Sequence, residues 1–402
     1  MLVSAYFAQA AEVAMATVTR SLSGTGPSTQ SHPKPASPST WARSSTPPTA
    51  STKREGASST TPATPTSATK GQEGAADQLS TGATTATTPP ESPRSSSEAA
   101  FRRVRALEEQ VKTDGACTLP GVSIAYELFM PIMMRAVARG YVRQEHADFV
   151  ANGLRFGFDL GVDVSKLRGR RLFRNYPTAL EARAAVTKAT RARVEQGKSL
   201  QLFPFRAEDR AMLDRWPSWR IFPMGAVPKP MEPGEMRPFS DHSKTGMKDA
   251  TNLELFRHTL TALKDIARFL KHMFYMRVSD VDAAFPLLPI APRLWRFMMF
   301  IWYDVQPGDE ASMLTWLYMH VCGDFGSAGL PGTWKIFFTD VVMGMARSEM
   351  VLTLEAPIYV DDISLIGELQ RMVDSEGVAL TAFLRELGIY LSLIHISEPT
   401  RP

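Results

Sequence analysis

The spacing of apolar residues after residue 100 alternates between the period of a helix and the period of a strand. Apolar positions three and four residues apart predict helices over Phe101–Lys112, Tyr126–Arg139 and Leu255–Met273. A short run rich in aromatic and β-branched residues predicts a strand over Phe274–Val281. Residues 221–253 are rich in proline and glycine, which indicates short extended pieces joined by tight turns.

The pattern nearer the C-terminus predicts a helix, a hairpin and a further helix. A stripe of large apolar residues indicates a helix that starts just after Pro331-Gly332. Pro357–Gly367 is typical of two strands joined by a two-residue acidic turn, and a helix over Glu368–Leu387 should end at Gly388. The order strand, helix, hairpin, helix predicts an α+β fold in which helices pack on one face of an antiparallel sheet.

The composition of the first hundred residues differs from that of the rest. In residues 21–100, 44 of 80 positions are Ser, Thr or Pro, and Trp41 is the one aromatic residue. Such a segment buries too little apolar surface to offset the entropy lost on ordering. We therefore expect residues 1–100 to be disordered, which leaves about 300 residues for a folded part with a sizeable core.

Charge, cysteine content and hydropathy narrow the class of protein. The net charge of +4 is small, so any site for a polyanion should be a local patch. Cys117 and Cys322 are too few for a disulfide framework or a Cys-rich zinc site, and they fit a reducing compartment.

The longest tight apolar cluster, Phe297–Tyr303, is far short of the roughly 20 residues that span a bilayer. The N-terminal segment lacks the basic start of a signal peptide. We expect an intracellular protein, in cytoplasm or nucleus, that is neither secreted nor membrane-bound.

One basic cluster allows two interpretations. It is either a solvated loop, which charge runs usually are, or a patch that contacts phosphates. Its members are Lys166, Arg168, Arg170, Arg171 and Arg174.

Two acidic positions stand where strands would otherwise bury apolar side chains. Asp361-Asp362 lies between apolar residues, and Asp280 ends the strand expected over Phe274–Val281. An Asp-Asp pair alone is more often a hairpin turn, because Asp tolerates turn geometry well. Two strands that each present a carboxylate can bring Asp280 and Asp361 together, and oxygen-only ligands point to Mg²⁺. Two such ions can activate a hydroxyl and stabilise a leaving phosphate oxygen.

Four segments resemble the motifs of one enzyme family. Tyr359–Asp362 resembles the Tyr-x-Asp-Asp catalytic motif of reverse transcriptases, and Ser279–Ile290 resembles the palm motif that precedes it. Between them, Phe325–Gly332 is similar to the Phe-Gly…Pro motif of retrotransposon enzymes. Upstream, Lys229 and Arg237–Asp241 are similar to the fingers motif. The motifs stand in the family's order, and the resemblance is closest to long-terminal-repeat and DIRS-like retrotransposon enzymes.

The resemblance implies a polymerase with a right-hand arrangement of fingers and palm. Residues 101–220 would form a helical region leading into the fingers, and residues 221–390 an incomplete fingers-palm domain. The implied reaction is the RNA-directed synthesis of DNA, in which a nucleotide passes from a dNTP to a primer 3′-OH by two-metal chemistry. The implied partners are an RNA or DNA template with its primer, and a dNTP.

The resemblance also assigns roles to individual residues. Asp280 and Asp361 would bind two Mg²⁺ ions, or Mn²⁺ in their place, with Asp362 assisting. Phe285 would exclude a ribose 2′-OH by steric clash and so favour deoxynucleotides; otherwise it is a core residue. The remaining nucleotide-binding residues would be Lys229, Arg237, Gly326 and Tyr359. Without the resemblance, Lys229 and Arg237 are ordinary surface residues and Gly326 is a turn residue.

Three departures from the family pattern stand out. Leu330 replaces the small residue that usually precedes the motif's proline, which puts the shape of the nucleotide pocket in question. Asp282 adds an acid close to Asp280, and we expect it to face away from the metals. Residues 391–402 resemble a translated sequencing-library adapter, so we expect them to lie outside the fold. Because primer grip and thumb motifs do not follow, we expect little or no processive activity from this chain.

Two other functions remain open at this point. The chain is either an active polymerase fragment or an inactive or domesticated retroelement remnant that at most binds nucleic acid. RNA-dependent RNA polymerases share the palm and an Asp-Asp hairpin, but Phe285 and Tyr359 speak against that class.

Overall fold

Three β-sheets and the helices around them make up the part of the chain that the structure describes. The computed structural model describes residues 93–206, 209–229, 232, 234–256, 275–305 and 313–397, all within one compact unit. Two expectations therefore lie largely outside the described residues: disorder over 1–92 and the helix over Leu255–Met273. The class expected for the rest is confirmed, because the described chain is α+β.

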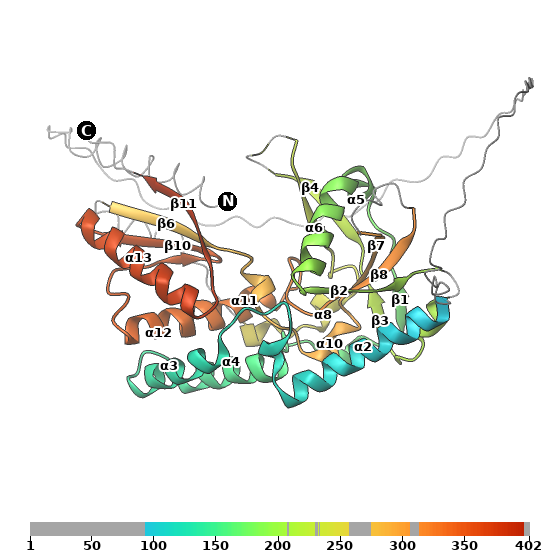
Figure 1. Ribbon diagram of the computed structural model, residues 1–402, viewed down its shortest axis with the longest axis horizontal. Coiled ribbons are helices and arrows are strands. Elements are labelled where there is room, and N and C mark those ends of the chain that lie inside the picture. The colour runs from blue at the N-terminus through green and yellow to red at the C-terminus, as the bar shows by residue number, and fades with distance from the viewer. Residues whose placement is uncertain are drawn as a thin grey trace, which may run out of the picture. The chain divides into compact units, whose positions relative to one another are not determined.

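A four-stranded antiparallel sheet, which we call the aspartate sheet, carries the acidic hairpin. Its strands, in spatial order, are β11 (Leu391–Ser397), β6 (Tyr275–Val281), β10 (Asp362–Gly367) and β9 (Ile358–Tyr359). Helix α13 (Gln370–Glu386) lies across this sheet in Figure 1 and ends before Gly388, which has φ +80°. Gly377 of α13 lies against the Arg277 side chain, so the helix covers the face that carries Arg277. The expected strand, hairpin and final helix are confirmed.

The C-terminal segment takes part in this sheet, contrary to expectation. The backbone of β11 pairs antiparallel with β6, with Leu391 opposite Val281. The expectation that 391–402 lies outside the fold is therefore wrong for Leu391–Ser397. The physical reason is general, because an edge strand offers unpaired N–H and C=O groups to any extended chain, whatever its side chains.

The largest sheet has five strands and is mixed, with both parallel and antiparallel pairs. Its strands, in spatial order, are β1 (Arg170–Leu172), β3 (Trp219–Ile221), β7 (Met299–Tyr303), β8 (Thr315–His320) and β2 (Ser199–Pro204). β3 runs parallel to both β1 and β7, and the other pairs are antiparallel. Sequence reasoning missed β1, β2 and β3, which lie inside the region 101–220 expected to be helical. These strands are short or lack clean alternation, and their pairing partners are distant in sequence.

Both faces of the five-stranded sheet carry buried side chains at β7 and β8, whereas β1 at its edge is exposed. Side chains at Phe300, Trp302 and Tyr318 pack with residues of α5 and α6 in one apolar cluster. Their neighbours on the strands, such as Met299 and Leu317, belong to the main core together with residues of α2. The alternation of successive side chains between the two faces accounts for this division.

A separate two-stranded hairpin carries Arg237, and Lys229 follows directly after its first strand. Its strands are β4 (Met224–Pro228) and β5 (Met236–Ser240), and they match the short extended pieces expected over 221–253.

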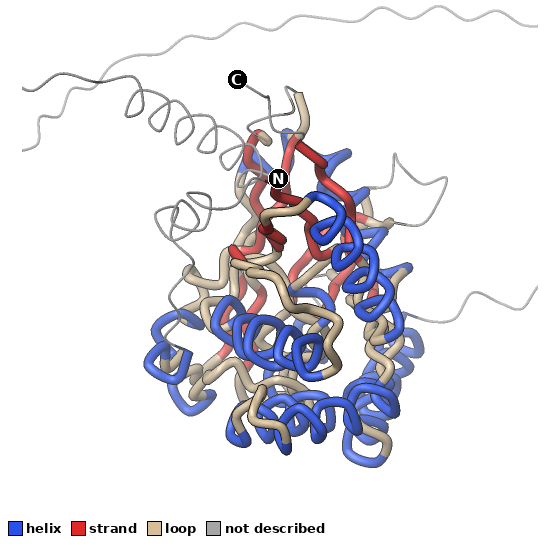
Figure 2. The backbone as a smooth tube through the Cα atoms, turned by 90° about the vertical axis from the view of Figure 1, so that its left-hand side faces the viewer, coloured by secondary structure: helices blue, strands red, loops and turns tan. Residues whose placement is uncertain are grey.

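Helices surround the sheets, and many gather on one side of the strands in Figure 2. The α-helices not yet named are α2 (Pro93–Thr113), α3 (Tyr126–Ala138), α4 (Gln144–Phe156), α5 (Pro177–Glu181), α6 (Arg183–Glu195), α7 (Arg210–Leu213), α8 (Met247–Ala250), α10 (Pro292–Trp295), α11 (Leu330–Trp334) and α12 (Met343–Ser348). Single 3₁₀ turns cover Ala116–Thr118, Val164–Lys166, Leu253–Phe256 and Phe285–Leu287. None of the described helices combines the length and apolar character that crossing a bilayer requires.

Two helices differ in detail from their sequence-based predictions, one in where it begins and one in its hydrogen bonding. α2 begins at Pro93, so the last residues of the range 1–100 are helical rather than disordered. Ser97 and Ala100 are buried there, which shows that this end of the segment joins the core. The helix expected after Pro331-Gly332 is confirmed, but its middle, Lys335–Val342, has π-helical hydrogen bonding.

Arg220 of β3 provides a test of this packing. The side chain is 3% exposed and donates hydrogen bonds to four backbone carbonyls, those of Arg168, Gly169, Trp219 and Thr245. Replacing it removes four hydrogen bonds, of which those to Trp219 and Thr245 are buried, so Arg220→Met should destabilise the protein by about 3 kcal/mol. Urea unfolding measures the change. The exposed Arg171→Met on β1 is the matched control and should change stability by less than about 0.5 kcal/mol; equal effects would contradict this account of Arg220.

Candidate functional site

Two carboxylates face each other across the aspartate sheet. The register of β6 and β10 places Asp280 directly opposite Asp362, so their side chains project to the same face. Asp362 is only 1% exposed. Among the described residues, neither carboxylate oxygen of Asp362 nor Oδ1 of Asp280 has a hydrogen-bond partner. An unpartnered buried carboxylate is costly, so this pair requires either bound protons or a cation.

The electrostatics of the acidic residues reflect this position. Burial, followed by the charges of Asp361 and Asp362, raises the pKa of Asp280 to about 7. Burial and the charge of Asp361 raise the pKa of Asp362 to about 6. Burial also raises the pKa of Asp361, against the opposing charge of Arg237. Among the acidic residues, Arg237 thus acts on Asp361, and its effect there is small beside that of burial.

The hairpin turn differs by one residue from the expected acidic pair. Val360 and Asp361 form the turn, whereas Asp362 opens β10 and pairs with Tyr359. Val360 has φ +58°, as the first central position of such a hairpin turn requires, although a β-branched residue is unfavourable there. The expectation of an Asp361-Asp362 turn is wrong because it assigned the turn by residue preference, and the pairing register overrides that preference.

Two hydrogen bonds hold this strained turn. The indole Nε1 of Trp334 donates to the carbonyl of Val360 at 2.7 Å. The backbone N–H of Val281, the residue after Asp280, donates to the carbonyl of Asp361 at 3.0 Å. Strained backbone of this kind costs about 1–3 kcal/mol and persists where its surroundings fix it. The sequence indicated Trp334 only as part of a helical stripe, and nothing in that stripe marks its hydrogen bond.

Arg237 and Lys229, the two basic residues predicted to bind the nucleotide, have different charged neighbours in and beside the hairpin β4–β5. Arg237 of β5 is opposite Val227 in the hairpin, and its charge opposes the rise in the pKa of Asp361. Lys229 follows β4, and its ammonium forms an ion pair with Glu232 at 2.7 Å. The structure thus associates Arg237 with the acidic residues and places Lys229 in a local ion pair.

The predicted aromatic gate and glycine lie in neighbouring segments. Phe285 is buried, and its ring centroid lies 5.2 Å from that of Phe325 and 6.4 Å from that of Trp334. Gly326 has φ +124°, and a Cβ there would overlap the carbonyl oxygen of Ser240 on β5. Gly326 is therefore required for close packing of its loop against β5. Phe325, which is 50% exposed, was not singled out from the sequence.

The remaining predicted positions have simpler surroundings. Tyr359 is half-buried in β9, and Leu330 is fully buried in the core at the start of α11. Asp282 is exposed, and its charge adds slightly to the rise in the pKa of Asp280. The five side chains of the basic cluster at 166–174 are exposed, as a solvated loop would have them, and Arg170 pairs with Asp214.

The acidic site fits a hard cation in the chemistry of its donors. Asp280 and Asp362 offer buried oxygens that nothing else in the described chain satisfies. Within the described ranges, however, no three His, Cys, Asp or Glu side chains converge closely enough to hold a metal ion. Mg²⁺ commonly binds through one or two carboxylates and completes its shell with water and substrate phosphates. The residues present therefore fit such an ion, with Asp362 rather than Asp361 opposite Asp280.

Sequence reasoning missed a buried polar network beside the site. Asp324 accepts a hydrogen bond from Nε2 of His242 at 2.9 Å and one from the hydroxyl of Ser327 at 3.2 Å. Nε2 of His320 lies 3.6 Å from the same Asp324 oxygen that His242 contacts. Gly323-Asp324 directly precedes the Phe-Gly motif, and His320 and Ser327 lie within four residues of Asp324 in sequence, whereas His242 comes from a distant segment.

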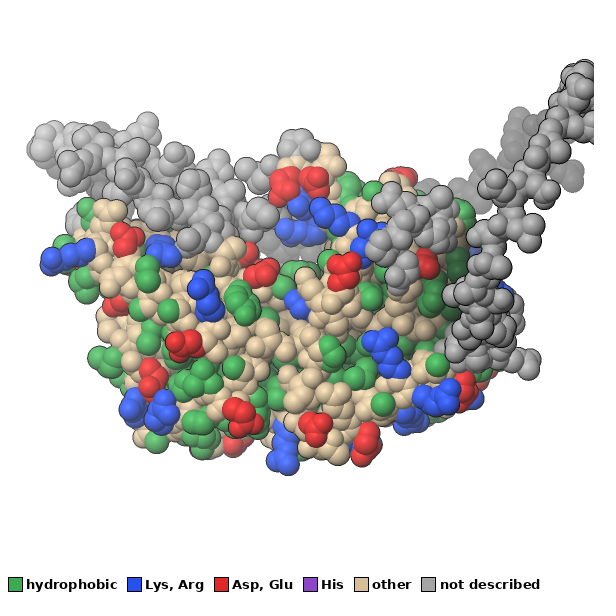
Figure 3. All heavy atoms as spheres, viewed as in Figure 1, with side chains coloured by type: hydrophobic (Ala, Val, Ile, Leu, Met, Phe, Trp, Pro, Cys, Tyr) green, Lys and Arg blue, Asp and Glu red, His purple; other side chains and the backbone are tan. Residues whose placement is uncertain are grey.

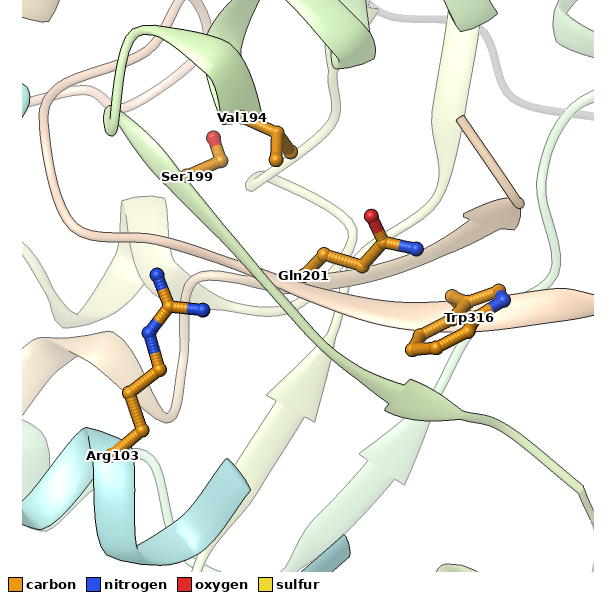
Figure 4. A pocket seen from close by; sticks show the side chains of 5 residues that line it. All are labelled: Arg103, Val194, Ser199, Gln201 and Trp316. Atoms are coloured by element: carbon orange, nitrogen blue, oxygen red, sulfur yellow. The ribbon is translucent and has the colours of Figure 1, made fainter. Parts of the chain in front are cut away.

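A cavity of about 250 Å³ lies elsewhere in the molecule (Figure 4). It is lined by α2, α6, β2 and β8 through Arg103, Val194, Ser199, Gln201 and Trp316. None of these is a predicted site residue.

The face shown in Figure 3 mixes blue Lys and Arg side chains with red Asp and Glu side chains, separated by apolar areas. This mixture agrees with the small net charge, and any electrostatic attraction of a polyanion to this face would be local.

Comparison with solved structures gives a distant similarity. No protein-family model matches the chain, and no curated protein matches it. Among solved structures, the crystal structure of the native prototype foamy virus protease-reverse transcriptase is similar with a TM-score of 0.38 and 18% identity. The match covers 56% of this chain and 25% of that chain, so it spans about a quarter of that protein's length.

The raised pKa values predict how stability depends on pH without metal. The folded protein keeps protons that the unfolded chain releases between about pH 4 and 7, so stability falls as pH rises through that window. Asp362→Asn removes one of the two facing negative charges, those of Asp280 and Asp362. Between about pH 5 and 8 in EDTA, the wild type should lose on the order of 2 kcal/mol more stability than the variant. Urea unfolding at both pH values measures this difference, and equal losses would contradict it.

The Trp334 hydrogen bond predicts a local effect. Trp334→Phe keeps an aromatic ring but removes the donor to Val360, so unfolding free energy should fall by about 1–2 kcal/mol. Amide exchange should accelerate most at Ile363, whose strand follows the turn. Trp302→Phe, which removes the indole bond from β7 of the five-stranded sheet to Thr187 of α6, is the control and should leave exchange at Ile363 unchanged. Equal acceleration in both variants would rule out a specific role for Trp334.

Proposed function

We propose that the chain is the fingers-and-palm part of an RNA-directed DNA polymerase of a retroelement. Its reaction would transfer a nucleotide from a dNTP to the 3′-OH of a primer on an RNA or DNA template. One observation carries the proposal: Asp280 and Asp362 face each other with unpartnered oxygens, directly beside the turn of the Tyr359–Asp362 motif. The ordered resemblance of four motifs supports the same function.

The acidic residues would hold the divalent cations. Asp280 and Asp362 offer oxygens to Mg²⁺ or Mn²⁺, and Asp361 contributes negative charge from the adjoining turn. A bound cation supplies charge neutralisation for the triphosphate and for the attacking and leaving oxygens. The unpartnered carboxylates explain why a cation would be favourable here, because it removes a repulsion that the fold otherwise retains.

The other residues would bind and select the nucleotide. Arg237, whose charge already acts on Asp361, suits a triphosphate through its planar fork of donors. Lys229 would need to exchange Glu232 for phosphate. Phe285 and the half-exposed Phe325 form a pair of rings, which offers an apolar surface for a sugar or base.

Single-nucleotide incorporation tests the proposal without requiring processivity. The purified chain with Mg²⁺, a primed template and one dNTP should extend the primer by one residue, and Asp280→Asn should lower the rate at least about 100-fold. Asp249→Asn, an exposed acid on α8, is the control and should retain the wild-type rate. If the wild type binds primed template but incorporates nothing, the alternative of a remnant that only binds nucleic acid replaces the proposal.

Metal binding gives a second, independent readout. Mn²⁺ titration followed by electron paramagnetic resonance should detect binding to the wild type that weakens at least about tenfold in Asp362→Asn. The Asp249→Asn control should bind as the wild type does. Unchanged Mn²⁺ affinity in Asp362→Asn would contradict the assignment of these carboxylates.

A further inference from the structure

The segment from Gly323 to Trp334 connects the three sheets. It leaves β8 of the five-stranded sheet, packs against β5 at Gly326 and continues into α11. At its end, Trp334 bonds to the turn of the aspartate sheet. We propose that Asp324 and His242 are positioning residues that fix this segment and thereby set where Arg237 lies relative to the aspartate hairpin. This inference rests on the proposed function.

The contacts of Asp324 attach the segment to β5. The carboxylate is 3% exposed and accepts from His242, which is 1% exposed and lies two residues after the end of β5. Gly326 meets the carbonyl of Ser240 on the same strand. Two points of the segment are thus held against one strand, and that strand carries Arg237.

A second set of contacts links Gly323-Asp324 to α6 and to the five-stranded sheet. Arg193 of α6 donates from Nε to the hydroxyl of Ser199 at 3.2 Å and from Nη2 to the carbonyl of Gly323 at 3.0 Å. The Ser199 hydroxyl lies 2.7 Å from Nδ1 of His320, whose Nε2 faces Asp324. With the His320 proton on Nε2, the Ser199 hydroxyl donates to Nδ1 and the Nε2–H faces the Asp324 carboxylate at 3.6 Å.

The charge of Asp324 makes these contacts strong. Burial alone would raise the pKa of Asp324, but the charge and hydrogen bond of His242, with His320 and Arg193, hold it well below its usual value. The side chain is therefore ionised, and charge-assisted hydrogen bonds are about twice as strong as neutral ones. Phe222 packs against both imidazoles, with ring centroids 4.4 Å from His242 and 5.6 Å from His320.

Nucleophilic catalysis by Ser199, His320 and Asp324 is the other function that this set of residue types suggests. Burial and the charge of Arg193 hold the pKa of His320 well below its usual value. Such a histidine is a weak base toward the Ser199 hydroxyl, which already accepts a hydrogen bond from Arg193. The electrostatics thus favour positioning.

A pair of substitutions at His242 tests the proposal. His242→Leu removes the donor to Asp324, whereas His242→Gln can present an amide N–H close to the position of Nε2. In the leucine variant, amide exchange at Leu330 and Thr333 should accelerate at least about tenfold, and the KM for dNTP in single-nucleotide incorporation should rise at least about fivefold with kcat changed less than about twofold. The glutamine variant should restore both the exchange rates and the KM toward their wild-type values.

Val104→Ala in α2 is the control for a general loss of stability, since it opens a cavity in the core away from this segment. The proposal is overturned if exchange at Leu330 and Thr333 is unchanged in His242→Leu, or accelerates equally in Val104→Ala. A fall in kcat without a rise in KM would also overturn it. If the wild type incorporates no nucleotide, the proposed function fails, and the exchange rates alone then decide whether Asp324 and His242 fix the segment.

Discussion

Asp280 and Asp362 are held face to face by the register of β6 and β10, where like charges repel and where few donors reach them. A fold gains nothing from this arrangement in stability, since an apolar pair at the same positions would pack without repulsion. Val360 next to it is also unfavourable, because a β-branched residue is strained at φ +58°. Unfavourable features that cluster at one end of a hairpin are typical of binding sites, and unpartnered carboxylate oxygens are the donors that the proposed cation would use.

The surroundings of the hairpin compensate for this local cost. The bonds from Trp334 and Val281 fix the turn, and α13 covers the opposite face of the sheet. On the other side, the ionised Asp324 concentrates hydrogen bonds where the segment toward α11 begins. The two carboxylate sites therefore differ in kind. Asp324 is fully provided with donors and stabilises the structure, whereas Asp280 and Asp362 lack donors and are available to a ligand.

The elements around the acidic site were predictable because each has a strong local signal. Residue content located β6, turn residues located the acidic hairpin and the end of α13, and the apolar stripe located the helix that contains Trp334. The register of the turn was not predictable, since both Asp361 and Asp362 suit a turn and only pairing with Tyr359 and Asp280 decides between them. The same limit applies to β1, β2 and β3, whose partners are distant in the chain.

The buried network shows why residue roles are harder to predict than elements. His242, Ser199 and Arg193 are distant in sequence from Asp324, whereas His320 is only four residues before it, and each is unremarkable in its own sequence context. Only the folded chain joins all four into one network around Asp324. The eight residues proposed from motif resemblance were identifiable for the opposite reason, since the motifs themselves are local in sequence.

The titration of the aspartate carboxyl groups, followed by carbon-13 NMR with and without Mg²⁺, tests the central claim most directly. The account predicts that Asp280 and Asp362 titrate as a coupled pair with apparent pKa values of about 7 and 6 in the absence of metal. Saturating Mg²⁺ should move both values below the ordinary aspartate range, because the cation favours the ionised forms. Titration near pH 4 that Mg²⁺ does not change would contradict the account.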